Sequence, residues 1–493
     1  MAPPTGTAGP RGAPPGLMGR VAHFLLHDTT VDGLRMWLVV LGVFLALVPS
    51  LGFVYVTGIF LNPIVREWNA TQADASLVST LNVGFFYLGG GVATPASDVV
   101  GVRPTVLAGI SLWVLGLVLA SYAESLGAMQ GTMGVVAGLG SALVMWPSLS
   151  VVPQWSNRYR STAVSLGALG AGVGNLVLAE SGVVLMAEIG WRGTLRVFAG
   201  IGAVCACLAI VLVERRLPRV KGGLLGAYRA SWRLLRTDRS FGVFLLACFI
   251  FQFAFLVPNV QMDTYALSLG YDASFAGLVT AMLGVGTCVG RIVLGPLGDV
   301  VGRFNVFHVS VVASAVCLFT LASATSEGGL LAWCILYPTF SGTVIAIFPV
   351  VIGNQWGLQF IGPGVAAVAL AMTPGGMAAG TLAGLAFDAG SFAPAFYACA
   401  GAMTLSALLF LTLREKRAPP KPQAPQAPAL TVATPSPQSS KDVDAGRAPT
   451  TSPTHGVRLQ RGSDASKARP VDGTPPPPHD ADDASGSDSM AMV

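Results

Sequence analysis

The stretch Asp98-Val99-Val100-Gly101, followed by Arg103, recurs in the second half of the chain as Asp299-Val300-Val301-Gly302, followed by Arg303. Each copy lies between two long apolar runs. A turn that repeats an acid, a glycine and a base at matching places predicts two related halves. Membrane transporters are commonly built from such repeats, and their solute binds where the halves meet. We expect both turns to act as conformational latches, each acid pairing with a basic group when the carrier is closed on that side.

Composition places the chain in a membrane. Its 493 residues are 53% hydrophobic and 11% charged, and the mean hydropathy of +0.64 is too apolar for a soluble protein. The basic residues lie in short loops without interleaved aromatic residues, which excludes nucleic acid as a partner. The seven cysteines lie in apolar runs without zinc spacing, so we expect free thiols, no metal and no cofactor. No catalytic triad or phosphate loop is present, and we expect no enzyme activity.

A helix that spans the hydrocarbon core of a bilayer needs roughly twenty apolar residues. Twelve such runs are predicted: 36–60, 76–97, 104–122, 129–153, 162–187, 194–213, 241–262, 275–297, 305–323, 328–352, 363–387 and 392–413. They fall into two groups of six, at 36–213 and 241–413. The predicted fold is therefore an all-α membrane protein with two pseudo-symmetric six-helix bundles.

The segments outside the bundles differ in composition from the bundles. Residues 214–240 are rich in arginine, which places this linker in the cytoplasm by the positive-inside rule. Counting outward, the repeated turns, the N-terminal segment 1–35 and the C-terminal segment 414–493 also face the cytoplasm. The last segment is rich in proline, serine and aspartate, so we expect a disordered tail that could bind a cytoplasmic partner. The expected location is the plasma membrane.

A second repeat supports the first. Trp146-Pro147 is followed by Gln154-Trp155, and Phe348-Pro349 is followed by Gln355-Trp356 at the matching place. Two parallel six-helix repeats with both termini inside resemble the major facilitator architecture. The repeated turn also resembles the loop between the second and third helices of that superfamily, which recurs between the eighth and ninth.

A narrower resemblance links the chain to the monocarboxylate transporter family. Asp32-Gly33 leads into the first predicted span, Pro258 precedes Asp263 at the outer end of the seventh, and Gly290-Arg291 precedes the second turn. Bacterial oxalate:formate exchangers share much of this pattern. The resemblance implies a secondary transporter of small monocarboxylates or related organic anions, in which Arg291 contacts the carboxylate.

Arg291 is the leading candidate for binding a substrate anion. It precedes Asp299 by about 12 Å of helix at 1.5 Å per residue, which places it near the middle of a hydrocarbon core of ~30 Å. An arginine at this depth is costly and commonly faces a water-filled path or a partner. Its planar guanidinium can bind a carboxylate through two hydrogen bonds. The alternative is a structural arginine bonded to helix carbonyls or paired across the bundle.

Two departures from the family bear on proton coupling. Proton-coupled members carry a lysine one turn after a tyrosine that matches Tyr55, where this chain has Ile59, and an aspartate where it has Thr287. Glu180 in the fifth span remains a coupling candidate, although such a glutamate commonly extends to the outer interface. Exchange or facilitated diffusion is therefore favoured over proton symport.

Other polar residues in the predicted spans are candidate substrate contacts or hinges. Tyr55, Asn82 and Tyr337 could contact the substrate, and each could instead satisfy a neighbouring helix. Pro374 and the two glycines after it interrupt the eleventh span, which indicates a gating hinge. Asn69-Ala70-Thr71 is an N-glycosylation sequon in the first non-cytoplasmic loop.

Two alternatives to a monocarboxylate carrier stay open. The solute could be of another class, such as an amino acid or a dicarboxylate. The chain could also be a non-transporting membrane sensor that keeps the fold and signals through its C-terminal tail.

Overall fold

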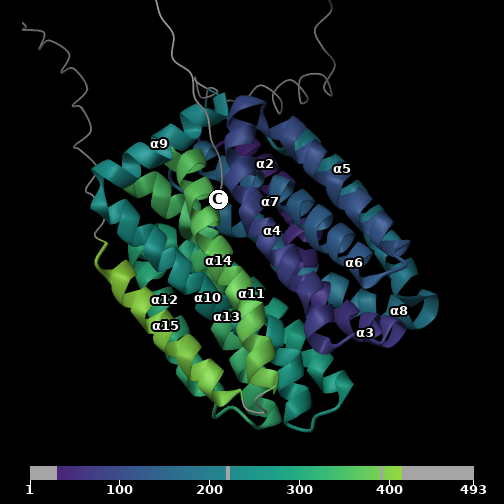
Figure 1. Cartoon of the computed structure of the whole chain (residues 1–493). Coiled ribbons are helices and arrows are strands. Elements are labelled where there is room, and N and C mark those ends of the chain that lie inside the picture. Colours follow the sequence, from purple (N-terminus) through teal and green to yellow (C-terminus); the bar gives the residue numbers. More distant parts are fainter. Residues whose placement is uncertain (1–29, 218–222, 389–391, 414–493) are drawn as a thin grey trace, which may run out of the picture. The chain divides into compact units, whose positions relative to one another are not determined.

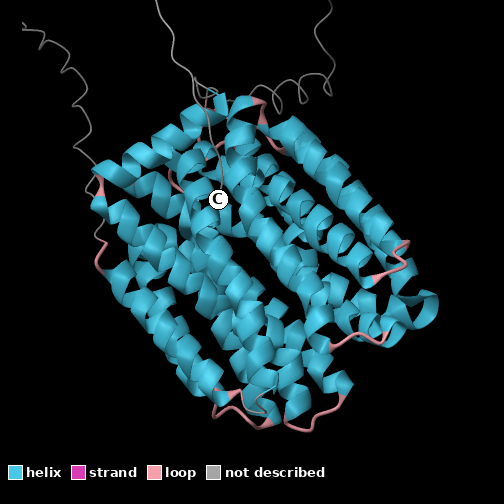
Figure 2. Cartoon of the chain, viewed as in Figure 1, coloured by secondary structure: helices cyan, strands magenta, loops and turns pink. Residues whose placement is uncertain are grey.

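The computed structural model describes residues 30–217, 223–388 and 392–413. Every regular element in these ranges is helical, and Figure 2 shows helices joined by short loops. Long apolar runs fold as helices because the bilayer core offers no hydrogen-bond partners to an open backbone. The predicted tail and most of the predicted N-terminal segment lie outside the described residues.

The first bundle runs from α2 to α8. Its elements are α2 (Leu34–Val56), η1 (Thr57–Phe60), α3 (Leu61–Trp68), α4 (Gln72–Val99), α5 (Val102–Ser121), α6 (Leu126–Met129), η2 (Gln130–Val136), α7 (Ala137–Trp155) and α8 (Arg160–Leu212). α8 is 53 residues long, but Gly190 within it has φ 71° and ψ 168°, a backbone conformation suited to glycine. The fifth and sixth predicted spans are therefore the two parts of α8, separated at Gly190.

The second bundle runs from α10 to α15. Its elements are α10 (Arg239–Ser268), α11 (Ala273–Val301), α12 (Arg303–Leu321), α13 (Glu327–Gln355), η3 (Leu358–Phe360), α14 (Ile361–Asp388) and α15 (Ala393–Leu411). In the described ranges, 11 helices are long and apolar enough to cross a membrane. Because α8 crosses twice, they provide the twelve predicted spans, arranged as two bundles side by side (Figure 1).

The linker between the bundles contains a helix that the sequence analysis did not predict. α9 (Gly223–Thr237) contacts α4 in the first bundle and α14 in the second. The Tyr228 hydroxyl donates to the Gly91 carbonyl of α4 at 2.9 Å, and the Ser231 hydroxyl donates to the Pro363 carbonyl of α14 at 2.8 Å. α9 therefore fastens to both sides of the seam where α4 packs against α14.

Close packing explains the glycine-rich start of α8. A Cβ atom on Gly170 would lie 2.0 Å from the Phe44 carbonyl oxygen of α2, and one on Gly174 would lie 2.2 Å from the Val48 carbonyl oxygen. Small residues let membrane helices approach closely and gain van der Waals contact. α2 and α8 thus form a tight pair, while α8 also packs against α11 of the second bundle.

The second repeated turn ties the two bundles together. The Asp299 carboxylate of α11 accepts hydrogen bonds from the backbone N–H groups of Ser161 and Thr162 at 3.0 and 2.8 Å. These groups belong to the first turn of α8, where the helix dipole favours a negative charge. Arg303 donates to the same carboxylate at 2.9 Å, and Gly302 has φ 114° in the turn between them. An acid of the second bundle therefore caps a helix of the first.

The first repeated turn lies beside a helix start of the other bundle, but among the described residues its carboxylate makes no hydrogen bond to that helix. Asp98 is buried and pairs with Arg215, and a Cβ atom on Gly362 at the start of α14 would lie 2.3 Å from its Oδ2 atom. Gly101 has φ 115°, like its counterpart in the other half, and Arg103 donates to the Val213 carbonyl at 3.1 Å. Both turns thus join the bundles on one face, which we call the latched face.

Asp32 supports the latched face from the first bundle. Its carboxylate accepts hydrogen bonds from the Ser156 hydroxyl at 2.9 Å and from the backbone N–H groups of Asn157 and Arg158. Burial raises the pKa of Asp32, but these hydrogen bonds outweigh that effect and hold its pKa below the ordinary aspartate value. The same loop accepts a hydrogen bond from Arg303 at the Asn157 carbonyl, at 2.7 Å. An ionised Asp32 therefore positions the loop at Asn157 to which Arg303 of the second repeated turn donates its hydrogen bond.

We expect Asp299→Asn to slow transport turnover by about tenfold, because carboxylate contacts with a helix N-terminus contribute roughly 1–2 kcal/mol. Equilibrium affinity for the transported solute should change little, since the residue lies on the latched face. Initial rates and equilibrium binding in proteoliposomes measure the two effects. Asp74→Asn, at the start of α4 on the opposite face, is the matched control. A large loss of affinity with normal turnover would contradict the latch.

Candidate substrate cavity

A cavity of about 710 Å³ lies between the two bundles. Polar residues line much of it: Tyr55, Thr57, Asn62, Ser76, Ser79, Thr80, Glu180, Asn259, Gln261, Asp263, Thr264, Asp272, Ser274 and Thr280. They all lie in the parts of their helices that are remote from Asp98 and Asp299. The exposed side chains of Asn62 and Asp272 mark its rim. The cavity therefore opens on the face opposite the latched face, which we call the open face.

A narrow extension of about 10 Å³ leads from the cavity toward the centre of the bundles. Tyr55, Asn259 and Thr280 line both spaces. Thr287 lines only the extension, and its hydroxyl donates to the Leu283 carbonyl at 2.9 Å. The position at which the resemblance to proton-coupled monocarboxylate transporters implies an aspartate therefore lies at the inner end of the cavity and is occupied here by the uncharged Thr287.

Arg291 lies one helical turn beyond Thr287 and is only 1% exposed. Its guanidinium donates to the Ala168 carbonyl of α8, so it bridges the two bundles, while its Nε atom has no hydrogen-bond partner. Tyr55 is the cavity residue that interacts with it electrostatically. Within the described residues Arg291 has no ion pair with a carboxylate. In this conformation Arg291 is bonded to a helix carbonyl, which is the structural alternative to binding a substrate anion. It lies behind the cavity wall and does not line the cavity.

Two predicted substrate contacts lie apart from the cavity. Asn82 is fully buried, and its side-chain amide donates to the Met133 carbonyl at 2.7 Å, which joins α4 to η2. Tyr337 is also fully buried; it stacks on Trp333 of its own helix, with ring centroids 4.6 Å apart, and its hydroxyl donates to the Phe255 carbonyl of α10 at 3.5 Å. Each satisfies a neighbouring helix, as the alternative interpretation of such residues expects.

Of the remaining predicted residues, Glu180 and Asn69 lie at the open face, and Pro374 lies halfway along its helix. Glu180 is exposed and lines the cavity, in keeping with a glutamate that extends toward the interface. Pro374 lies inside α14, two residues before Gly376 of the cavity wall. Asn69 is exposed and has a left-handed backbone conformation, with φ 46°, in the turn between α3 and α4. The sequon therefore lies on the face where the cavity opens.

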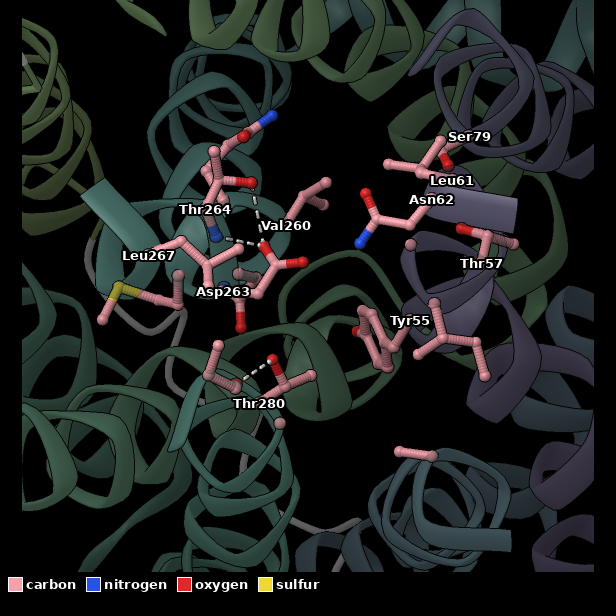
Figure 3. A pocket seen from close by; sticks show the side chains of 18 of the residues that line it. Tyr55, Thr57, Leu61, Asn62, Ser79, Val260, Asp263, Thr264, Leu267 and Thr280 are labelled. Carbon is pink, nitrogen blue, oxygen red and sulfur yellow. Dashed lines mark hydrogen bonds between the residues drawn. The ribbon is translucent and has the colours of Figure 1, made fainter. Parts of the chain in front are cut away.

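Asp263 on α10 is the cavity residue that the sequence analysis quoted but gave no role. Its Oδ1 atom accepts hydrogen bonds from the Thr264 N–H and hydroxyl groups at 2.7 and 3.2 Å. Figure 3 shows its carboxylate directed into the cavity toward Asn62. A signal was present in the sequence, because Asn259 and Asp263 are one helical turn apart and so share a face of an otherwise apolar span.

The cavity wall carries negative charge. Glu180, Asp263 and Asp272 line it, and no lysine, arginine or histidine does so among the residues that the structure describes. Asp272 also caps α11, where its Oδ1 atom accepts a hydrogen bond from the Phe275 N–H at 3.0 Å. The nearest positive charge along the path inward is therefore Arg291, beyond the narrow extension.

Comparison with known proteins agrees with this arrangement. A family model described as the Major Facilitator Superfamily matches residues 43–273 and 247–452. The chain belongs to the major facilitator superfamily. It is 28% identical over 399 residues to Monocarboxylate transporter 4 of Mus musculus, which covers 78% of this chain and 83% of that protein. It is 26% identical over 322 residues to the MFS-type transporter pynF of Aspergillus niger, which covers 65% of this chain and 74% of that protein.

A solved structure supports the fold. The proton:xylose symporter XylE, bound to 6-bromo-6-deoxy-D-glucose, aligns with a TM-score of 0.60 and 13% identity, covering 77% of this chain and 95% of that chain. At this identity the likeness concerns the fold alone. The chain is therefore a major facilitator transporter in a multi-pass membrane fold, with monocarboxylate transporters among its relatives, and not an enzyme. The predicted fold class and family are confirmed.

We expect a thiol introduced in the cavity to react from the open face. Thr280→Cys should be labelled rapidly by a membrane-impermeant thiol reagent added on the side of Asn69, because Thr280 lines the cavity. Ser165→Cys is the matched control, since Ser165 is fully buried beside Gly295 near the latched face. Labelling is compared with that of the parent chain. Equal reaction at both positions would contradict a cavity closed on the latched face.

Proposed function

We propose that the chain carries small monocarboxylates or related organic anions across the membrane by alternating access. The observation that carries this proposal is Arg291, a buried guanidinium without a carboxylate partner among the described residues. A charge buried in this way is costly unless it is paired. A small organic anion supplies the missing partner. The likeness to Monocarboxylate transporter 4 supports the same class of solute.

The path to Arg291 suits a carboxylate. Tyr55, Asn259, Thr280 and Thr287 provide hydroxyl and amide groups along the narrow extension between the cavity and the arginine. Tyr55 and the second amide proton of Asn259 can donate hydrogen bonds to a carboxylate that has left water, and the Thr280 and Thr287 hydroxyls can do so by turning away from the Ala276 and Leu283 carbonyls. Once the anion reaches the guanidinium, the planar fork can hold it through two parallel hydrogen bonds.

Arg291 also connects anion binding with the change of access. Its bond to the Ala168 carbonyl crosses the seam between α11 and α8, so the guanidinium faces the boundary that moves when the bundles rock. An anion that takes over the guanidinium replaces this bond. The guanidinium thus has different partners in the empty and the loaded carrier. A substrate can shift a conformational equilibrium only by such a difference in interaction free energy between the two states.

We place the latched face, both termini and the linker in the cytoplasm, because the arginine-rich linker follows the positive-inside rule. We place the chain in the plasma membrane, so that the open face is directed to the outside of the cell. A glycan at Asn69 would report this orientation. The tail 414–493 would be available to a cytoplasmic partner. Because Thr287 has no carboxylate that could bind a proton, this position alone favours exchange or uniport over proton symport.

The acidic cavity wall favours one alternative solute, an amino acid, whose ammonium group could contact Asp263 while its carboxylate moves inward. A sensor that signals through the tail is the alternative without transport. Counterflow in proteoliposomes separates them, with labelled lactate, pyruvate, acetate, formate, oxalate and alanine as solutes. Transport of alanine alone would favour the amino acid. Removal of residues 420–493 should leave flux intact in a carrier and abolish the output of a sensor.

We expect Arg291→Lys to lower anion counterflow sharply and Arg291→Gln to abolish it. Lysine keeps the charge but loses the fork, and the loss of a buried charge-assisted pair costs about 2–5 kcal/mol, roughly thirty- to several-thousand-fold in affinity. The measurement is the concentration dependence of counterflow in proteoliposomes.

Arg196→Gln is the matched control for this experiment. Arg196 is an arginine of α8, whereas Arg291 belongs to α11; it donates to the Ser121 hydroxyl at 3.0 Å and lies over the Tyr122 ring, away from the cavity. This variant should transport normally. Normal counterflow by Arg291→Gln at equal protein abundance would remove the chemical basis of the organic-anion assignment.

A further inference from the structure

We infer that Asp263 is a proton-binding site that couples the movement of a proton to the movement of the anion, an inference that rests on the proposed function. Thr287, in place of the aspartate that the resemblance to proton-coupled monocarboxylate transporters implies, favours exchange or uniport. The structure supplies a carboxylate elsewhere, on α10, in the wall of the cavity. The ligand of this site is a proton delivered from water on the open face.

The Asp263 carboxylate is open to the cavity on one side. One oxygen accepts two hydrogen bonds from Thr264, and the other makes none with the described residues. In Figure 3 this side chain points across the cavity toward Asn62, which belongs to the first bundle. The free oxygen can therefore take a proton from cavity water, and in its protonated form it can donate a hydrogen bond across the cavity.

The groups that face Asp263 bring no positive charge. α8 contributes Glu180 to the cavity wall, the start of α11 contributes Asp272, and α2 contributes Tyr55. The lining residues of α4 are serines, a threonine and a valine, and α14 contributes Gly376. An anion that enters this cavity meets three carboxylates and no cation in the described lining. Its passage becomes favourable when a proton is bound on the wall.

Asp263 is the most suitable of the three carboxylates. Glu180 and Asp272 are exposed, and Asp272 is engaged in capping α11. Asp263 is only partly exposed and faces the interior of the cavity, so its charge changes the field that the anion experiences. Thr280, which lines the same cavity, precedes Arg291 by about 16 Å of helix at 1.5 Å per residue. The proton and the anion therefore occupy separate sites on the second bundle.

Charge balance gives the coupling rule. In the loaded carrier, the anion neutralises Arg291 and the proton neutralises Asp263. In the empty carrier, Arg291 is positive and Asp263 is negative. Both residues belong to the second bundle and move together, so either form crosses without net charge from this pair. An anion without its proton, or a proton without its anion, leaves one unit of net charge on this pair of sites, and enclosing an uncompensated charge between the bundles is unfavourable. One proton thus enters, and leaves, with each anion.

The test compares net accumulation with exchange in the same proteoliposomes. An inward proton gradient of one pH unit can drive about tenfold accumulation through one-to-one coupling, because one pH unit corresponds to about 1.4 kcal/mol. We expect this accumulation of a labelled anion from the counterflow panel in the parent chain. Asp263→Asn, which resembles the protonated form, should abolish accumulation. It should retain counterflow at equal pH, because exchange never requires the empty carrier to return.

Further variants complete the experiment. Asp263→Glu keeps a carboxylate and should retain accumulation, whereas Asp74→Asn, at the start of α4 and outside the cavity lining, should leave both accumulation and counterflow unchanged. Counterflow by Asp263→Asn also shows that this variant is folded. If Asp263→Asn accumulates the anion normally, or loses counterflow as well, Asp263 is not the coupling site. Loss of accumulation in Glu180→Gln alone would transfer the role to Glu180.

The same measurements separate this inference from the proposed function. Parent protein that exchanges anions but ignores the proton gradient overturns the inference and leaves the anion carrier intact. Parent protein that exchanges none of the tested anions overturns the proposed function itself.

Discussion

The structure depends on carboxylates of one bundle that are held at the helix starts of the other. Asp299 receives two backbone N–H groups of α8, and Asp98 lies against the first turn of α14. These contacts keep α8 beside α11 and α4 beside α14 on the latched face. The cavity on the open face exists because the same helix pairs are parted at their other ends. Contacts between charges and helix ends are directional but individually modest, so they can hold one face closed and still release it.

The sequence predicts the fold well because a membrane restricts the possible answers. Apolar runs of spanning length must be helical, and the repeated turn at Asp98 and Asp299 shows how the halves correspond. What the sequence does not contain is the local geometry. The break between the fifth and sixth spans is a kink at Gly190 inside one long helix, between Glu188 and Arg192, and α9 lies in a linker whose arginines suggest only charge.

Individual site residues are harder to predict, because polarity in a span does not reveal the neighbour. Asn82 and Tyr337 are polar, yet each donates a hydrogen bond to a backbone carbonyl of an adjacent element, Met133 for Asn82 and Phe255 for Tyr337. Asp263 lies near a helix end, where an acid is unremarkable in sequence, but Pro258 lies inside the same helix and the cavity reaches inward past Asp263 to Asn259. Which face of α10 meets the cavity depends on packing against both bundles. That information lies in distant contacts and not in the local pattern.

The linker helix adds a mechanical element to the carrier. Tyr228 holds a carbonyl of α4 and Ser231 holds a carbonyl of α14, so α9 works as a strap across the seam with one fastening on each bundle. Any rocking motion that parts α4 from α14 has to release one fastening or carry the strap along with one bundle. The linker therefore does more than join two halves of a chain: its two hydrogen bonds add to the free energy that is needed to open the latched face.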